Sequence, residues 1–240
     1  MTSPLPKTNP IASQGYLLVN KPKGKTAFSL VAVLRRRLGI QKIGHAGTLD
    51  PLATGVMVML LGKEYTKLSD KFLTEDKEYL AQVQLGIETD TYDSEGQPMG
   101  GTAHCPTLEE VQEVLEQFQG DIMQIPPMFS AKKVNGQKLC NLARKGKTVD
   151  RLPVKVKVDI DLLNYQYPYI DLRINCSKGT YIRSLAHDMG KLLTCGAHLS
   201  ALVRTRSGHF HLRDCMDGEL LFSGPADIGL ESHISKLHFL

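Results

Sequence analysis

The chain has 240 residues, of which 42% are hydrophobic and 22% are charged, and its formal net charge at pH 7 is +4. This composition is typical of a globular protein with one large domain or two small ones, and it argues against a disordered chain. The longest apolar run, residues 56–61, is too short to cross a membrane, and we expect no signal peptide in the polar, proline-rich start. Five scattered cysteines without a CxxC pair indicate reduced thiols and a cytoplasmic protein.

The charge is unevenly distributed along the chain. Residues 1–50 carry a net +7, residues 51–130 a net −10 and residues 131–240 a net +7. The densest basic stretch, residues 132–157, contains nine Lys or Arg and one acid, Asp150. Such a stretch is either an ordinary solvated face or a binding surface for a polyanion.

The N-terminal region predicts a flexible arm, a strand and a helix. Residues 1–14 form the expected arm, and the apolar residues 16–20 predict a buried strand. Thr26 is placed to cap a helix that ends at Gly39. The apolar positions of this helix recur at steps of three and four, at Phe28, Val31, Leu34 and Leu38.

The middle of the chain predicts a loop, two strands and a helix. Residues 44–55 are rich in Gly, Pro and Thr and predict a loop, which leads into a fully apolar central strand at 56–61. Alternating apolar residues at 79–85 predict a half-buried strand. Residues 107–119 predict a helix, because Thr107 and Glu110 form a capping box at its start.

The C-terminal half predicts a strand pair followed by a helix and another strand. Residues 154–162 and 170–176 alternate between apolar and polar side chains and predict two antiparallel strands. A glycine turn then leads into a helix at 182–192, and residues 199–206 predict a further strand. Strands and helices interleave irregularly, which favours the α+β class.

Several nucleotide and metal motifs fail on inspection. Gly24-Lys25-Thr26 resembles the end of a phosphate-binding P-loop, but Val19 occupies the position of its first glycine. The acidic turn near residue 90 has Tyr92 at a calcium-ligand position. The possible zinc pairs, Cys195 with His198 and His209 with His211, lack a completing pair. We therefore expect neither a metal nor a cofactor.

An unusual segment places a carboxylate in the middle of a loop. Residues 45–55 read HAGTLDPLATG, so Asp50 lies between a glycine-bearing turn and the predicted central strand. Pro51 fixes the backbone after it, and loops mounted on rigid strands often carry catalytic groups. From these residues alone, an ordinary turn or capping aspartate remains the alternative.

This segment closely resembles the catalytic loop of the TruB family of tRNA pseudouridine synthases. Other blocks resemble the family in the same order, at residues 20–26, 77–91, 125–146, 176–190 and 195–208. The resemblance implies a pseudouridine synthase fold, a mostly antiparallel mixed sheet flanked by helices, in a catalytic domain at 15–208. Residues 209–240 are too few for a full C-terminal RNA-binding domain, and we expect a short tail or a truncated accessory domain there.

The resemblance also assigns roles to individual residues. It implies that Asp50 is the catalytic carboxylate, that Tyr79 packs on the target base, and that Arg183 pairs with the aspartate. Asp90 corresponds to a second acid of that network, and His45 to a histidine that contacts the RNA where the base has left. The remaining assignments are Tyr181 and Leu202 in the uridine pocket, a supporting role for Lys21, and backbone contacts from Lys132, Lys133, Arg144 and Lys145.

The implied reaction isomerises uridine to pseudouridine at position 55 in the T-loop of tRNA, after base flipping. The reaction needs no cofactor, and Asp50 has three open routes: attack at C1′, addition at C6, or formation of a glycal. We expect the T-arm of tRNA as partner, bound in a cationic groove that both basic segments form. We expect no membrane association and no obligate protein partner. A non-catalytic tRNA-binding module is the alternative.

Three positions depart from the family's pattern. Asn20 stands where aspartate is frequent, Ala27 where serine is common, and Cys140 where tyrosine is common. None is the catalytic position, so we expect activity with altered local RNA contacts.

Overall fold

The computed structural model describes residues 14–73, 76–130, 132–134, 136–225 and 227–236. The chain forms two compact units. Unit 1 comprises residues up to Leu73 and from Phe210 onward, and unit 2 spans Thr74–His209. Apart from Gln14, the predicted N-terminal arm lies outside the described residues.

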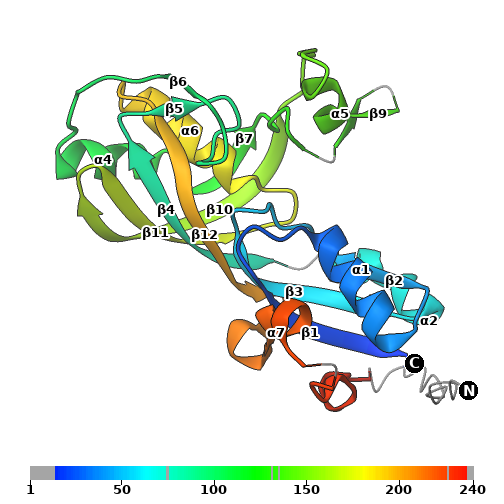
Figure 1. Cartoon of the computed structure of the whole chain (residues 1–240). Helices are drawn as coiled ribbons and strands as arrows, with labels where there is room; N and C mark the ends of the chain where they lie inside the picture. The colour runs from blue at the N-terminus through cyan, green and yellow to red at the C-terminus, as the bar shows by residue number, and fades with distance from the viewer. Residues whose placement is uncertain (1–13, 74–75, 131, 135, 226, 237–240) are drawn as a thin grey trace, which may run out of the picture. The chain divides into compact units, whose positions relative to one another are not determined.

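Unit 1 is built on a small mixed sheet (Figure 1). Strand β1 (Gly15–Lys21) and strand β2 (Ile43–Ala46) both lie antiparallel to β3 (Thr54–Leu61), and β14 (Met216–Asp217) joins β1 in parallel. All of β3 after Thr54 is buried, so the prediction of a central strand is confirmed. The predicted loop at 44–55 is wrong at its start, because residues 44–46 belong to strand β2. Backbone pairing with β3 forms this strand, and the local sequence gives no sign of it.

Helix α1 (Ala27–Leu38) begins and ends as predicted, and its predicted apolar residues Val31 and Leu34 are buried. The Thr26 side chain accepts a hydrogen bond from the Ser29 amide, and Gly39 closes the helix at φ 68°. Phe28, expected in the core, is 73% exposed. The buried residues all lie in about the first two turns of the helix: Ala27, Leu30, Val31, Val33 and Leu34.

The C-terminal segment packs into unit 1. It contains β13 (Phe210–His211), the 3₁₀ turns η1 (Leu212–Asp214) and η2 (Leu230–His233), and α7 (Glu219–Ser223). Phe210 packs on Tyr16 of β1 and on Phe72 of α3 (Ser69–Leu73). Helix α2 (Lys63–Thr66) precedes α3 in the chain. Arg37 of α1 donates hydrogen bonds to four carbonyls around the end of α7, at Leu220, Leu221, Gly224 and Pro225. The predicted tail is therefore part of a folded unit.

Unit 2 contains an antiparallel sheet in the order β12–β4–β11–β10–β7. The bounds of its strands are Ala197–Ser207, Lys77–Leu85, Tyr169–Cys176, Val154–Gln166 and Gly120–Gln124, respectively. The odd-numbered residues of β4 are buried, as the alternation predicted. Four of these strands are predicted from the sequence and confirmed. The fifth, β7, is not, because its exposed and buried residues give no clear apolar alternation.

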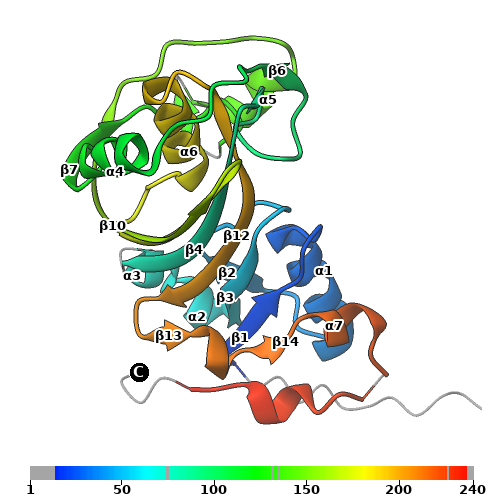
Figure 2. The ribbon, with the colours of Figure 1, turned by 90° about the vertical axis from the view of Figure 1, so that its left-hand side faces the viewer.

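Two helices cover this sheet, and α6 (Ile182–Leu192) lies over β12 and β4 (Figure 2). Its predicted apolar face is buried except for Leu192, which is 47% exposed at the helix end. Helix α4 (Leu108–Glu116) starts with the predicted Thr107–Glu110 capping box. Short elements complete the unit: β5 (Glu88–Thr89), β6 (Pro98–Gly100), β8 (Lys133–Val134), β9 (Gln137–Lys138) and α5 (Leu139–Ala143).

The α+β class is confirmed, since the sheets are mostly antiparallel with the β1–β14 pair parallel and helices alongside. In the described part of the chain, no helix has the length and hydrophobicity needed to span a membrane.

Candidate active site

The loop that carries Asp50 is anchored on both sides of this residue in unit 1. It connects β2 to β3, and its apolar residues Leu49 and Leu52 are only 4% and 2% exposed. The Ala53 amide donates a 3.1 Å hydrogen bond to the Asp50 carbonyl and so closes a tight turn. Asp50 itself is partly exposed. The loop therefore carries Asp50 on a backbone that its neighbours hold in place.

Lys21 holds this loop through hydrogen bonds from its buried side chain. Its side chain is fully buried, and Nζ donates hydrogen bonds to the carbonyls of Pro22 at 2.8 Å, Lys25 at 2.6 Å and Pro51 at 3.2 Å. The Gly24 amide donates to the same Pro51 carbonyl at 2.8 Å. A buried ammonium requires such partners. Residues 20–26 thus hold the carbonyl of Pro51, the residue after Asp50, and a supporting role of Lys21 in the reaction stays a prediction.

Asn20 fixes the other end of the loop. Its Oδ1 accepts a 3.1 Å hydrogen bond from the amide of Gly55, which has φ 106°. An amide oxygen accepts this bond as a carboxylate oxygen does. Asparagine, which stands where the family frequently has aspartate, therefore provides an acceptor for the Gly55 amide. His45 lies half-buried on β2, opposite Met59 of β3.

Arg183 is buried in the first turn of α6 in unit 2, with 4% of its surface exposed. Its Nη1 lies 3.5 Å from Oδ2 of Asp93 and donates a 3.1 Å hydrogen bond to the Thr91 carbonyl. Its Nη2 donates a 2.8 Å hydrogen bond to the Phe129 carbonyl. Such a planar set of donors is held in one orientation when several acceptors surround it.

The acid beside Arg183 corrects the expectation from the resemblance, which pointed to Asp90. Asp90 is exposed and its carboxylate accepts a hydrogen bond from the Gln97 amide. Asp93 is 3% exposed, and its Oδ1 accepts from Thr91 Oγ1 and from the Glu95 amide. The sequence offers three acids between residues 90 and 95, and only the folding of the turn selects which one faces inward.

Tyr79 and Leu202 lie on one face of the sheet of unit 2. Arg204 of β12 lies opposite Tyr79 of β4, and Leu202 lies opposite Ala81. Directly opposed residues of an antiparallel pair share a face, as do residues two apart on a strand. Tyr79 and Leu202 are 8% and 7% exposed. Tyr181 directly precedes α6, two residues before Arg183.

Gln124 is a residue that the sequence analysis missed. It ends β7, is 2% exposed, and forms two hydrogen bonds with the backbone of Tyr181. A lone glutamine before a proline-rich loop gives no signal of this kind in the sequence. The pairing connects β7 to the start of α6 and thereby to Arg183.

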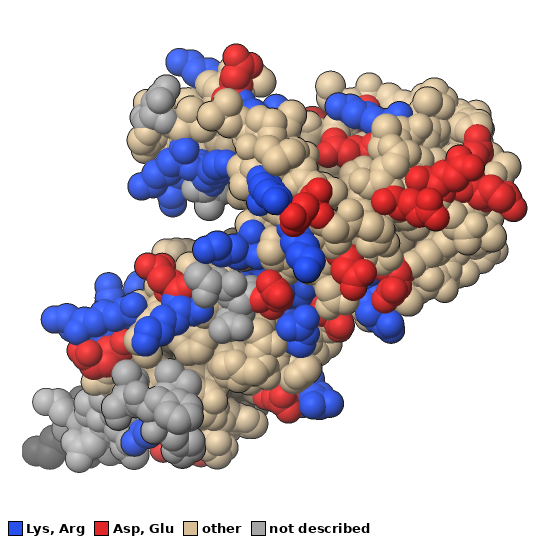
Figure 3. All heavy atoms as spheres, turned by 180° about the vertical axis from the view of Figure 1, so that it is seen from behind, with Lys and Arg blue, Asp and Glu red and all other residues tan. Residues whose placement is uncertain are grey.

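The predicted RNA-backbone residues lie together around β8, β9 and α5. Lys132, Lys133, Arg144 and Lys145 are all exposed. Figure 3 shows acidic side chains gathered at the end of unit 2 that carries α4, and mostly basic ones at the end that carries α5. The acids of α4 are Glu109, Glu110, Glu113 and Glu116. The two signs of charge are thus separated within the unit.

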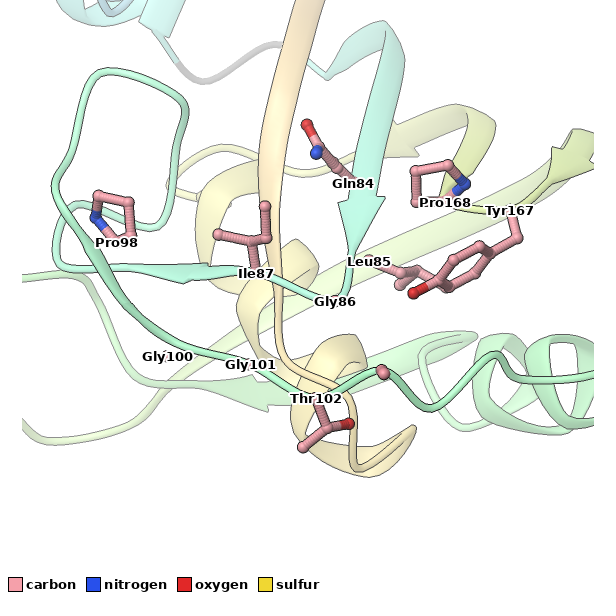
Figure 4. A pocket seen from close by; sticks show the side chains of 11 residues that line it. Gln84, Leu85, Gly86, Ile87, Pro98, Gly100, Gly101, Thr102, Tyr167 and Pro168 are labelled. Atoms are coloured by element: carbon pink, nitrogen blue, oxygen red, sulfur yellow. The ribbon is translucent and has the colours of Figure 1, made fainter.

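The described residues of unit 2 line, among others, two cavities of about 560 Å³ each. The first lies at the end of β4, where Tyr167, Ile87 and Pro98 surround a glycine-rich backbone (Figure 4). No predicted site residue lines it. The second is lined by the turn that holds Arg183 and by the basic segment, including Asp90, Thr91, Tyr92, Phe129, Lys147 and Arg151. The second cavity is therefore the one that adjoins the residues around Arg183.

The five cysteines are free, and burial raises the pKa of Cys176 to about 11 and also raises that of Cys195. Thiols with such a pKa are protonated at pH 7 and are poor nucleophiles. Among the described residues, no group of three His, Cys, Asp or Glu side chains is arranged to hold a metal ion.

Sequence comparison connects these features to a family. The sequence profile of the TruB family pseudouridylate synthase N-terminal domain matches residues 35–182, and that of the tRNA pseudouridylate synthase B C-terminal domain matches residues 183–222. The chain belongs to the TruB family of pseudouridylate synthases. The expectation of an enzyme of this family is confirmed.

Two curated members of the TruB family illustrate the similarity. A tRNA pseudouridine synthase B from Protochlamydia amoebophila is 61% identical over 88% of this chain and 80% of its own length. One from Chlamydia abortus is 54% identical over 90% of this chain and 92% of its own length.

Solved structures confirm the pseudouridine synthase fold. A chain in the crystal structure of a Cbf5-Nop10-Gar1 complex superposes with a TM-score of 0.67 at 30% identity and 86% coverage of this chain. A chain in an H/ACA RNP bound to a substrate RNA containing 2′-deoxyuridine gives a TM-score of 0.64 at 29% identity. This TruB-family chain covers 53% and 52% of those chains, about half of their length.

Proposed function

We propose that this TruB-family enzyme isomerises uridine to pseudouridine at position 55 in the T-loop of tRNA. The observation that carries the proposal is the position of Asp50, a partly exposed residue on a loop held by Lys21 and Asn20. The printed names of the relatives, tRNA pseudouridine synthase B, support tRNA as the substrate.

The proposed reaction rearranges bonds within one nucleotide. The C1′–N1 bond breaks, the uracil turns, and a C1′–C5 bond forms, while the proton leaves C5 and N1 ends with a proton. Atoms and electrons therefore balance without a further reactant. Asp50 acts as the ionised carboxylate that assists bond breaking, by attack at C1′, by addition at C6, or by removing a ribose proton to give a glycal.

We assign Arg183 and Tyr79 to the same nucleotide. A guanidinium near a catalytic carboxylate favours its charged form. The target base leaves its stack at a free-energy cost of a few kcal/mol. Stacking on an aromatic ring such as Tyr79 returns about 1–3 kcal/mol. Tyr181 and Leu202 complete the pocket in this proposal, and His45 contacts the RNA where the base has left.

Binding of the T-arm is assigned to the basic surface around α5. Lys132, Lys133, Arg144 and Lys145 are exposed and close in sequence, as phosphate contacts require. A cationic groove that unites both basic segments over Asp50 stays a prediction, as does a cytoplasmic location.

Release of tritium from tRNA tests the proposed function directly. A tRNA transcript labelled with tritium at uridine C5 loses the label to water when the base is rejoined through C5. We expect release of one equivalent per tRNA, and none from a matched transcript with cytidine at position 55. Release that is the same for both transcripts would contradict position 55. Clean tRNA binding with no release from either would favour the non-catalytic binding module.

A further inference from the structure

We propose that the stack of Tyr92 on His187 is a positioning device for Arg183. The inference rests on the proposed function, because it gives two residues outside the expected site a part in the same reaction. The rings are stacked with centroids 3.7 Å apart and planes inclined by 14°. The stack connects the acidic turn at residues 89–96 to helix α6.

The backbone at Tyr92 explains why the turn needs support. Tyr92 has φ 66°, a left-handed conformation that is unusual for a bulky side chain. A non-glycine residue in this region is strained and persists only where its surroundings hold it. The ring of His187 on one side and the Leu199 amide, which donates to the Tyr92 carbonyl at 3.0 Å, provide that hold.

The two neighbours of Tyr92 are both partners of Arg183. The Thr91 carbonyl accepts from Nη1, and the Asp93 carboxylate lies 3.5 Å from it. Any rotation of the turn about Tyr92 therefore moves both groups relative to the guanidinium. His187 lies four residues after Arg183 on α6, on the same side of the helix. Helix α6 thus carries the guanidinium on Arg183 and contacts the turn through His187.

The state of His187 suits a stacking role. The residue is 3% exposed, and neither ring nitrogen forms a hydrogen bond with a described residue. Glu88 Oε1 lies 3.2 Å from Nδ1 without the geometry of a hydrogen bond, and the Glu88 side chain is 35% exposed, so that solvent screens its charge. His187 therefore contributes its ring face, which a phenyl ring also offers.

The test separates the ring from the turn conformation. Tyr92→Gly removes the stack but relieves the left-handed backbone, whereas Tyr92→Phe and His187→Phe keep a stacked pair. We expect Tyr92→Gly to lower kcat for tRNA about 10-fold with the tRNA Kd changed less than about 2-fold. Both phenylalanine variants should retain kcat within about 2-fold. Wild-type kcat in Tyr92→Gly would overturn the inference.

A second measurement does not depend on catalysis. Hydrogen exchange followed by mass spectrometry should show faster exchange at residues 91–96 in Tyr92→Gly than in Tyr92→Phe. Unchanged exchange would overturn the positioning role. If the wild type releases no tritium from tRNA, the proposed function fails, and the exchange comparison still decides the role of the stack. If Tyr92→Gly does not fold, His187→Ala removes the same stack and is measured in the same way.

Discussion

Gln124 and Tyr181 are joined by two reciprocal hydrogen bonds between a side-chain amide and a backbone. Gln124 Nε2 donates to the Tyr181 carbonyl at 3.0 Å, and the Tyr181 amide donates to Gln124 Oε1 at 2.8 Å. The side chain of one buried residue, Gln124, therefore bonds both the amide and the carbonyl of Tyr181. Because Tyr181 directly precedes α6, this contact sets where the helix begins and where Arg183 leaves it.

Replacing Gln124 with Met should reduce both stability and turnover. The change keeps the length of the side chain but removes the acceptor of the Tyr181 amide, at a cost of about 1–3 kcal/mol. The Tyr181 carbonyl keeps its hydrogen bonds from the Ser184 and Leu185 amides. Urea unfolding measures this loss, and kcat for tRNA reports the displacement of Arg183. Gln119 provides a matched control, since it forms the same reciprocal pair with Ile160 of β10. Gln119→Met should cost similar stability with little change in kcat, and equal losses of kcat would contradict the role of Gln124.

Asp93 and Asp90 should respond very differently to the same substitution. Asp93→Asn removes the charge next to buried Arg183, and breaking such a pair costs about 3 kcal/mol. Asp90→Asn affects an exposed carboxylate, and a change of less than about 0.5 kcal/mol is typical of such sites. Thermal unfolding and kcat of the two variants check this. A larger loss of kcat in Asp90→Asn would restore the original assignment.

The salt dependence of tRNA binding should locate the phosphate contacts. Each phosphate contact that is lost lowers the slope of log K against log salt by about 1. We expect Lys132→Ala and Lys133→Ala each to weaken binding and reduce this slope. Lys67→Ala is the control for net charge, since Lys67 is an exposed lysine of unit 1 paired with Glu64 at 3.0 Å. Equal slopes in all three variants and the wild type would exclude the surface around α5 as the contact.

The protein should lose stability in mild acid through His187. Burial, with a smaller contribution from Lys191, lowers the pKa of His187 to about 4, whereas a histidine in an unfolded chain has a pKa of about 6.5. Between these pH values the unfolded chain takes up a proton that the folded protein does not, so unfolding is increasingly favoured as the pH falls. The free energy of unfolding should therefore fall from pH 6.5 to pH 4 by less in His187→Phe than in the wild type. Identical pH dependence would contradict the burial of a neutral ring.

Local sequence signals predicted most of the fold correctly. Thr26 and Thr107 cap the helices that they were expected to cap, and the alternation in β4 and β11 gave both strands. These features depend on near neighbours in the chain. Phe28 failed because the buried face of α1 depends on what packs against the helix, which its own periodicity does not reveal.

The candidate site shows the same division. The resemblance singled out Asp50 in its loop, and its catalytic role stays a prediction. The role of Asp93 depended on a turn with Tyr92 in a left-handed conformation, and that of Gln124 on a contact 57 residues away in sequence. Such long-range contacts have no local pattern. They define how Arg183 is held, and the sequence alone could only name the arginine.

The central claim is that the carboxylate of Asp50 performs the chemistry. Asp50→Asn keeps the shape of the side chain, and the bonds from Lys21 and Gly24 to the Pro51 carbonyl remain available to hold the loop. The decisive measurement is tritium release from C5-labelled tRNA by this variant, together with its tRNA Kd. We predict no detectable release with a Kd within a few-fold of the wild type. Release at the wild-type rate would contradict the assignment of Asp50.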